Sequence, residues 1–135
     1  MATGPNWGGL DKGLLAQGTS AYAVGQVVKL GTVPQSCAAT TAALTASEFG
    51  GVCMEDIDAN KVATGKAIIN VRLGGIAPVR VGAANIPKGA RLTSNASGQV
   101  VVQATAGGPV LGILLETGGA VGTLSEMYLT PGATL

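Results

Sequence analysis

The only cluster of carboxylates in the chain covers residues 55–60 and reads Glu-Asp-Ile-Asp-Ala-Asn. Its two aspartates and its asparagine match the first half of a calcium-binding loop, in which alternate side chains supply oxygen ligands. The match then ends, because Lys61 stands where the loop needs a glycine and Ala67 stands where it needs a bidentate glutamate. The sequence therefore favours a solvated turn, and it predicts no bound metal and no cofactor.

The chain contains no histidine, which removes the commonest general base, the Ser-His and Cys-His nucleophile pairs and every histidine metal site. Glu55 and Glu116 could flank a glycosidic bond as a pair of carboxylates. They also close two similar stretches of sequence, so we interpret them as the polar tips of equivalent strands. Gly65 and Lys66 lack the other residues of a phosphate-binding loop. The sequence predicts a protein that is not an enzyme.

Cys37 and Cys53 are the only cysteines, and their spacing is not that of metal ligands. A disulfide needs an oxidising compartment, which nothing in the sequence indicates. We therefore expect two buried free thiols.

The composition is poor in charge, with 11% charged residues, 47% apolar residues and 22 glycines. Ordinary soluble domains carry about 25% charged residues, so part of this surface should be apolar and should meet other protein. The net charge is +1 and the chain has one Trp, two Tyr and one Phe. It thus offers neither the basic stripe nor the stacking surface of a nucleic-acid-binding protein. We expect a homo-oligomer or an assembly component without a nucleic-acid partner.

No apolar run approaches the roughly 18–20 residues that a membrane-spanning helix needs. Asp11, Lys12 and several glycines interrupt the N-terminus where a signal peptide would place its apolar region. These features predict a soluble protein without a membrane partner, synthesised in the cytoplasm.

Short runs of Val, Ile and Leu alternate with Gly, Pro, Asn and Ser at intervals too short for helices. Residues 91–93 and 99–102 flank a turn rich in Asn, Ser and Gly, which predicts a hairpin. Residues 66–73 alternate between a core face and a semi-polar face. Gly74 and Gly75 are expected to turn the chain into the next strand, and a last strand over residues 123–129 is expected to stop at Pro131. The fold class is all-β, a compact antiparallel barrel or sandwich of about eight short strands with one core over residues 20–135. Residues 1–19 are rich in Gly without a helix or strand period, and predict an extended, flexible N-terminal arm.

Residues 20–55 resemble a later stretch that ends at Glu116. The opening glycines Gly25 and Gly89 lie 64 positions apart, and the closing glutamates Glu55 and Glu116 lie 61 apart. Two interpretations stay open: two related β units packed face to face, or a Gly-turn-Val meander that resembles itself.

Five short motifs, in order along the chain, resemble the capsid decoration (cement) proteins of tailed bacteriophages. They are Gly51–Ala59, Val71–Val79, Ile86–Thr93, Gly112–Glu116 and Leu129–Gly132. The resemblance extends over about residues 18–132. It implies a compact β domain, usually trimeric, that sits outside an icosahedral shell where coat subunits meet and braces it. The family has no catalytic residues to carry over.

The resemblance gives the chain an expected role on the virion, at the outer surface of the capsid, where it stabilises the lattice of the major capsid protein. Its partners would be that protein and its own copies, in a trimer. Candidate capsid or inter-subunit contacts are the arm residues Trp7, Leu10, Leu14 and Leu15. Trp7 could anchor in a neighbour's pocket or fold back onto its own barrel. Removing residues 1–18 is expected to leave the β domain folded and to weaken its attachment to shells.

Two other functions stay open. One is a tail, spike or other surface subunit of a phage. The other is a small-ligand-binding β-barrel, which would need an open interior, whereas the small aliphatic residues predict a filled one.

Overall fold

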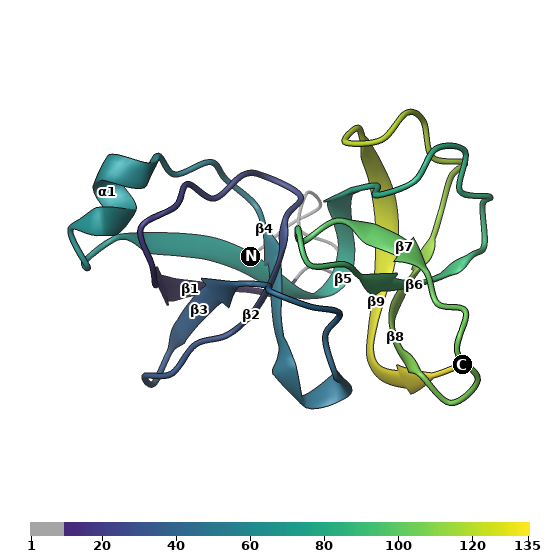
Figure 1. Cartoon of the computed structure of the whole chain (residues 1–135), viewed down its shortest axis with the longest axis horizontal. Helices are drawn as coiled ribbons and strands as arrows, with labels where there is room; N and C mark the ends of the chain where they lie inside the picture. The colour runs from purple at the N-terminus through teal and green to yellow at the C-terminus, as the bar shows by residue number, and fades with distance from the viewer. Residues whose placement is uncertain (1–9) are drawn as a thin grey trace, which may run out of the picture.

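The computed structural model describes residues 10–135 and confirms the all-β prediction, with nine strands in this range (Figure 1). The elements are β1 (Leu10–Ala16), β2 (Val27–Leu30), β3 (Ser36–Ala39), the 3-10 turn η2 (Ala46–Glu48), β4 (Phe49–Cys53), α1 (Ala59–Ala63), β5 (Ile68–Arg80), β6 (Arg91–Ser94), β7 (Val100–Val102), β8 (Pro109–Leu114) and β9 (Leu124–Thr134). Figure 1 shows two β lobes side by side, and β5 runs from one into the other. Within the described range no helix is long and apolar enough to cross a membrane.

The N-terminal lobe is a closed barrel of five strands in the order β1-β3-β2-β4-β5. The first half of β5 pairs with β4 and also with β1, and the second pairing closes the ring. All neighbours are antiparallel except β1 and β3, which run parallel through Leu15–Ser36 and Ala16–Cys37. Because β1 pairs with both β3 and β5, neither end of the strand order is a free sheet edge.

Read from β1 in the opposite direction, the order of the first lobe is β1-β5-β4-β2-β3. The C-terminal lobe has the matching order β5-β9-β8-β6-β7, with the second half of β5 in the place of β1. A parallel bridge between Val81 and Val100 joins the chain just after β5 to β7, as β1 joins β3 in the first lobe. The hairpin β6–β7 matches the one predicted from residues 91–102.

Hydrogen bonds at corresponding positions show that the two lobes are built alike, although they lie side by side and not face to face. The amide of Gly25 donates to the carbonyl of Cys53 at 2.8 Å, and the amide of Gly89 donates to that of Leu114 at 2.7 Å. Both glycines have positive φ, 84° and 87°, which an L-residue rarely adopts. Because the units share β5, they run continuously into one another instead of forming two separate sheets.

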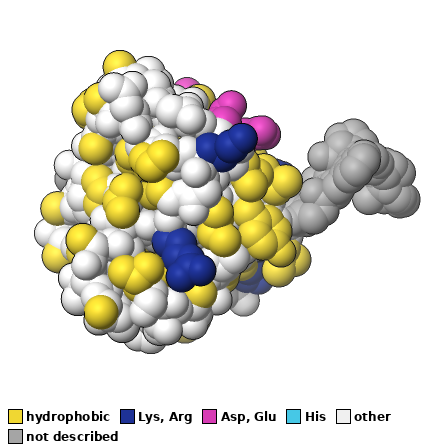
Figure 2. All heavy atoms as spheres, turned by 90° about the vertical axis from the view of Figure 1, so that its right-hand side faces the viewer, with side chains coloured by type: hydrophobic (Ala, Val, Ile, Leu, Met, Phe, Trp, Pro, Cys, Tyr) yellow, Lys and Arg dark blue, Asp and Glu magenta, His cyan; other side chains and the backbone are white. Residues whose placement is uncertain are grey.

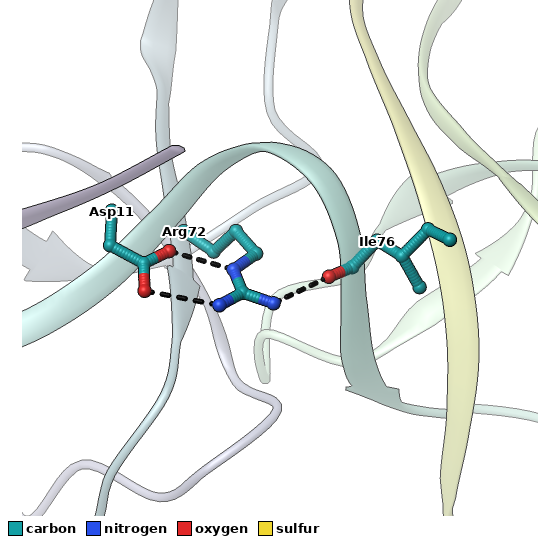
Figure 3. Close-up of polar contacts among 3 residues, drawn as sticks. All are labelled: Asp11, Arg72 and Ile76. Carbon is teal, nitrogen blue, oxygen red and sulfur yellow. Dashed lines mark hydrogen bonds and ion pairs between the residues drawn. The ribbon is translucent and has the colours of Figure 1, made fainter. Parts of the chain in front are cut away.

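The bend of β5 is where one lobe passes into the other. Sequence reasoning predicted a turn between two strands at Gly74 and Gly75, but β5 continues through both residues and Gly75 adopts a φ of 86°. Arg72 holds the bend from two sides (Figure 3). Its Nε and Nη2 donate to the Asp11 carboxylate at 2.7 and 3.1 Å, and its Nη1 donates to the Ile76 carbonyl at 2.8 Å. The hydrogen bond from Arg72 holds the pKa of Asp11 below its usual value.

The buried apolar side chains form two clusters, where one core was expected. One fills the N-terminal barrel: Leu14, Ala16, Tyr22, Val28, Cys37, Cys53, Ile57, Val62, Ile69 and Val71. The other cluster lies mainly in the C-terminal lobe, and it also includes four residues of the N-terminal lobe: Val27, Leu44, Phe49 and Val52. Two clusters arise because β2 and β4 bury both faces, so the adjacent Val27 and Val28 point into different clusters.

Residues 10–16 correct the prediction that residues 1–19 carry no strand. They form β1, which pairs with β5 over six positions. The remaining part of the predicted arm that precedes β1 lies outside the described residues. The glycine within β1, Gly13, interrupts the alternation by which a strand is recognised in a sequence.

Two further predicted boundaries move. The predicted turn at residues 56–61 contains the start of α1, capped by Asp58, whose side chain accepts a hydrogen bond from the Lys61 amide. The last strand, predicted to stop at Pro131, continues as β9 to Thr134. Pro131 fits because it lies at a register shift opposite β8, where the ladder does not need its missing N–H.

Candidate interaction surfaces

The carboxylates of the 55–60 cluster each hold a backbone amide. Glu55 Oε2 accepts from the Asn70 amide at 2.8 Å, and Asp56 Oδ1 accepts from the Val24 amide at 2.8 Å. Asp58 Oδ1 accepts from the Lys61 amide at 2.9 Å. Within residues 10–135 no group of three or more His, Cys, Asp or Glu side chains could hold a metal ion. The cluster that resembles half a calcium loop thus stabilises local backbone.

Glu55 and Glu116 occupy equivalent places in the two lobes, as the sequence comparison predicted. Glu116 Oε1 accepts from the Glu126 amide at 3.1 Å, just as Glu55 accepts from Asn70. In each lobe the residue before the glutamate also donates its amide to the same partner: Met54 to the Asn70 carbonyl and Leu115 to the Glu126 carbonyl, both at 2.9 Å. Each glutamate therefore secures the end of its own strand pair, and the two serve separate lobes.

Cys37 and Cys53 are free and buried inside the N-terminal barrel, which confirms the predicted thiols. Burial raises the pKa of Cys37 to about 11 and that of Cys53 to about 12. Beside them, burial and then the charges of the two thiolates raise the pKa of Tyr22 to about 12, and its hydroxyl donates to the Gln17 carbonyl at 2.5 Å. The barrel interior therefore keeps all three groups protonated at neutral pH.

These raised pKa values predict a loss of stability in alkali. The unfolded chain ionises its thiols from about pH 9, whereas the folded chain does so only near pH 11–12. The stabilisation is therefore complete below pH 9 and is lost as pH rises toward 12, by at least about 2 kcal/mol. Chemical denaturation at pH 8 and pH 10.5 measures it. The double variant Cys37→Ala, Cys53→Ala is the control, and an equal alkaline loss in that variant would contradict the assignment.

The structure separates the four residues predicted to make external contacts. Trp7 lies outside the described residues. Leu10 is 63% exposed, at the start of β1, and Leu15 is half-buried opposite Ser36 and Ile68. Leu14 is 4% exposed and belongs to the barrel core, so its apolar surface is already covered by its own chain. Of the three described residues, Leu10 has the most surface left for a partner.

An apolar row on the outer face of the C-terminal lobe was not found by sequence reasoning. Ile76 pairs with Tyr128, Tyr128 pairs with Ile113, and Ile113 pairs with Arg91, so the row crosses β5, β9, β8 and β6. Ile76 is 41% exposed and Tyr128 is 48% exposed. In Figure 2, which views the end of this lobe, hydrophobic side chains lie in several patches among other side chains and backbone, and only a few charged side chains are in view. The sequence of β9 did contain a pattern that indicates this face, because Leu124, Glu126 and Tyr128 alternate with buried residues and point outward.

A second apolar surface lies on the N-terminal lobe. A groove of about 350 Å³ is lined mainly by apolar atoms, with Leu30 and Val33 exposed at its rim and Leu14 and Leu73 also in its wall. Lys12 of β1 is the one charged residue that lines it. This groove and the exposed Leu10 both involve β1, the strand that continues from the predicted arm.

Comparisons with known proteins give one informative result. No protein-family model matches the chain, and no curated protein matches it. Among solved structures, the fold is similar to that of the head fiber gp8.5 N base of bacteriophage phi29, with a TM-score of 0.64 and 16% sequence identity. The similarity covers 94% of this chain and 98% of that one. The chain therefore shares its whole fold, both lobes included, with the base of a phage head fiber.

Proposed function

We propose that this chain is a non-enzymatic structural protein of a tailed-phage head, which decorates the exterior of the icosahedral shell and stabilises the assembled lattice of the major capsid protein. The observation that carries the proposal is the fold shared over nearly the full length of both chains with a phage head fiber base. The order of motifs that resembles capsid decoration proteins points to the same place on the virion.

The surface suits a protein that works in an assembly. Several large apolar side chains stand exposed in a chain with 11% charged residues. Scattered exposed apolar residues are normal in any protein, but the alignment of Ile76, Tyr128 and Ile113 across three neighbouring strands supports a contact surface there. We infer that the chain meets both coat protein and its own copies, in a homotrimer. Several weak contacts per trimer would then act together at high effective concentration.

The described residues favour a structural role over catalysis or ligand transport. Glu55 and Glu116, the carboxylate pair considered for glycosidic chemistry, each accept a hydrogen bond from a backbone amide, and they do so in separate lobes. The barrel interior is filled by its own buried side chains, which disfavours the alternative of a ligand-binding barrel. A small barrel filled by its own side chains leaves no interior space for a ligand.

Rebinding to heads tests the proposal. Heads from a phage that lacks this gene are mixed with the purified protein, and co-sedimentation is compared between assembled heads and free coat subunits. We expect binding to the assembled heads only, and decorated heads should withstand heating better, because a ligand that binds only the assembled lattice stabilises it. Equal binding to free subunits, or no binding to heads, would contradict the proposal.

A further inference from the structure

We propose that the outer face of the C-terminal lobe, centred on the row Ile76–Tyr128–Ile113–Arg91, is the surface through which one copy of this chain binds a second copy. The inference deepens the proposed function and rests on it, since it identifies the surface that would join the copies into one decorating unit.

The row is continuous because its four members are direct cross-strand partners on neighbouring antiparallel strands. Directly paired residues point to the same face of a sheet, and their side chains touch. The residues that alternate with them, such as Ala77, Met127 and Leu114, are buried in the lobe. Leu115 and Leu124 extend the exposed apolar surface on the same side of β8 and β9. The face thus presents a continuous strip of exposed side chains whose opposite sheet face is buried in the core.

A groove of about 220 Å³ adjoins the strip, lined by Arg91, Val110, Ile113, Thr130, Ala133 and Thr134. Its volume is below the roughly 300–1,000 Å³ typical of small-molecule sites, so it suits a single side chain of a protein partner. The Thr130 hydroxyl is buried without a hydrogen-bond partner among the described residues. Beside this groove Tyr128 and Ile76 project, and an aromatic anchor of this kind contributes strongly to protein–protein interfaces. The face therefore carries both a projection and a recess.

The charges on the face indicate that the partner is a second copy. Arg91 ends the row on β6, and Glu126 lies on β9 one row away, opposite Pro78. The only ion pair in residues 10–135 joins Arg72 to Asp11, so Arg91 and Glu126 have no charged partner there. Arg80, which also borders the face, is engaged by the carbonyls of Val24 and Gly122.

The face carries the cation Arg91 and the anion Glu126, with the carboxylate of Glu116 beside Glu126, so it offers both signs of charge to another copy. In a homotrimer, Arg91 of each chain would lie toward Glu126 of the next chain around the threefold axis, and the apolar strip of each chain would be covered by its neighbour. A partner surface of uniform charge would instead place a like charge against Arg91 or Glu126, which costs affinity. Self-association also accounts for the low number of charges, since the apolar strip is then buried.

Charge reversal provides the sharpest test. Sedimentation velocity is measured on the full chain from about 1 to about 100 μM, a range that brackets Kd values near 10 μM. We expect concentration-dependent association, weakened about tenfold or more by Arg91→Glu and equally by Glu126→Arg. Combining the two reversals should restore association, because the pair is then re-formed with opposite polarity. A monomer at every concentration, unchanged association in the single variants, or no recovery in the combined one would overturn the proposal.

A second pair of variants separates the apolar strip from general surface hydrophobicity. Ile76→Ser with Tyr128→Ser should weaken association at least about tenfold, and both side chains are exposed, so the fold should tolerate the change. Leu30→Ser is the matched control, because Leu30 is 53% exposed but lies on β2 of the other lobe. Equal weakening by Leu30→Ser would show that the assigned face is wrong. Thermal unfolding of each variant verifies that it is folded.

Binding to heads distinguishes this inference from the proposed function. If the wild-type chain decorates heads but sediments as a monomer, the inference fails and the proposed function stands. If the wild-type chain associates through this face but ignores heads, the inference stands and the proposed function fails. If both hold, the Ile76→Ser, Tyr128→Ser variant should still reach heads but leave them more readily, because it has lost its multivalency.

Discussion

Removing residues 1–18 should unfold the N-terminal lobe, whereas removing residues 1–9 should leave it folded. The longer deletion takes away β1, which closes the barrel by pairing with β5 over six positions and with β3 over two. It also removes Leu14 and Ala16 from the core and Asp11 from Arg72. Loss of one buried leucine alone costs about 2–5 kcal/mol, so the longer deletion should cost about 4 kcal/mol or more. This revises the expectation that residues 1–18 form a dispensable arm.

Urea denaturation of the two truncated chains measures the difference. The chain without residues 1–9 serves as the matched control, because it retains every contact described for residues 10–135. If both truncations are equally stable, β1 does not hold the barrel. The shorter truncation also tests residues 1–9, Trp7 among them, since weaker binding to heads at unchanged stability would assign this segment to attachment.

Replacing Gly112 with alanine should destabilise the C-terminal lobe by about 3 kcal/mol, the upper range for inserting atoms into a packed core. Gly112 is buried in β8, and a Cβ there would lie 2.5 Å from the Tyr128 carbonyl oxygen and 2.6 Å from Met127 Cγ. A backbone oxygen cannot rotate away as a flexible side chain can, so β9 must move. The shift would also displace Tyr128, and we expect self-association to weaken along with stability.

Gly74→Ala is the matched control for this substitution. Gly74 also lies in a strand, but a Cβ there would meet Leu10 Cβ at 3.7 Å, an ordinary contact. We expect a change of about 0.5 kcal/mol or less, as for most surface substitutions. Thermal unfolding measures the stability of both variants. If the two variants lose comparable stability, the close approach of β8 and β9 is not the reason for the glycine at position 112.

Local signals carried most of what the sequence predicted correctly. The hairpin β6–β7 was recognised because its turn residues stand next to each other in the chain, and the alternation of Ile69 and Val71 identified the core face of β5. The relation between the lobes was visible because Gly25 and Gly89 each take a positive φ that favours glycine at the same point of each unit.

What the sequence did not show depends on pairings distant along the chain. Asp11 and Arg72 lie 61 residues apart, so nothing near Leu10 indicates that β1 closes a barrel. Whether a set of strands forms a barrel or a sandwich is decided by such closing pairs, not by the periodicity of each strand. For the same reason the row Ile76–Tyr128–Ile113–Arg91 could not be predicted, since its members come from four strands aligned only in the folded chain.

The most direct test of the structural role is an electron cryo-microscopy difference map between heads with and without this protein. We predict density for the two-lobed body on the outer surface of the shell, where coat subunits meet, with its copies touching through β9 and β8. Identical shells in the two maps, or density confined to the tail, would contradict the account.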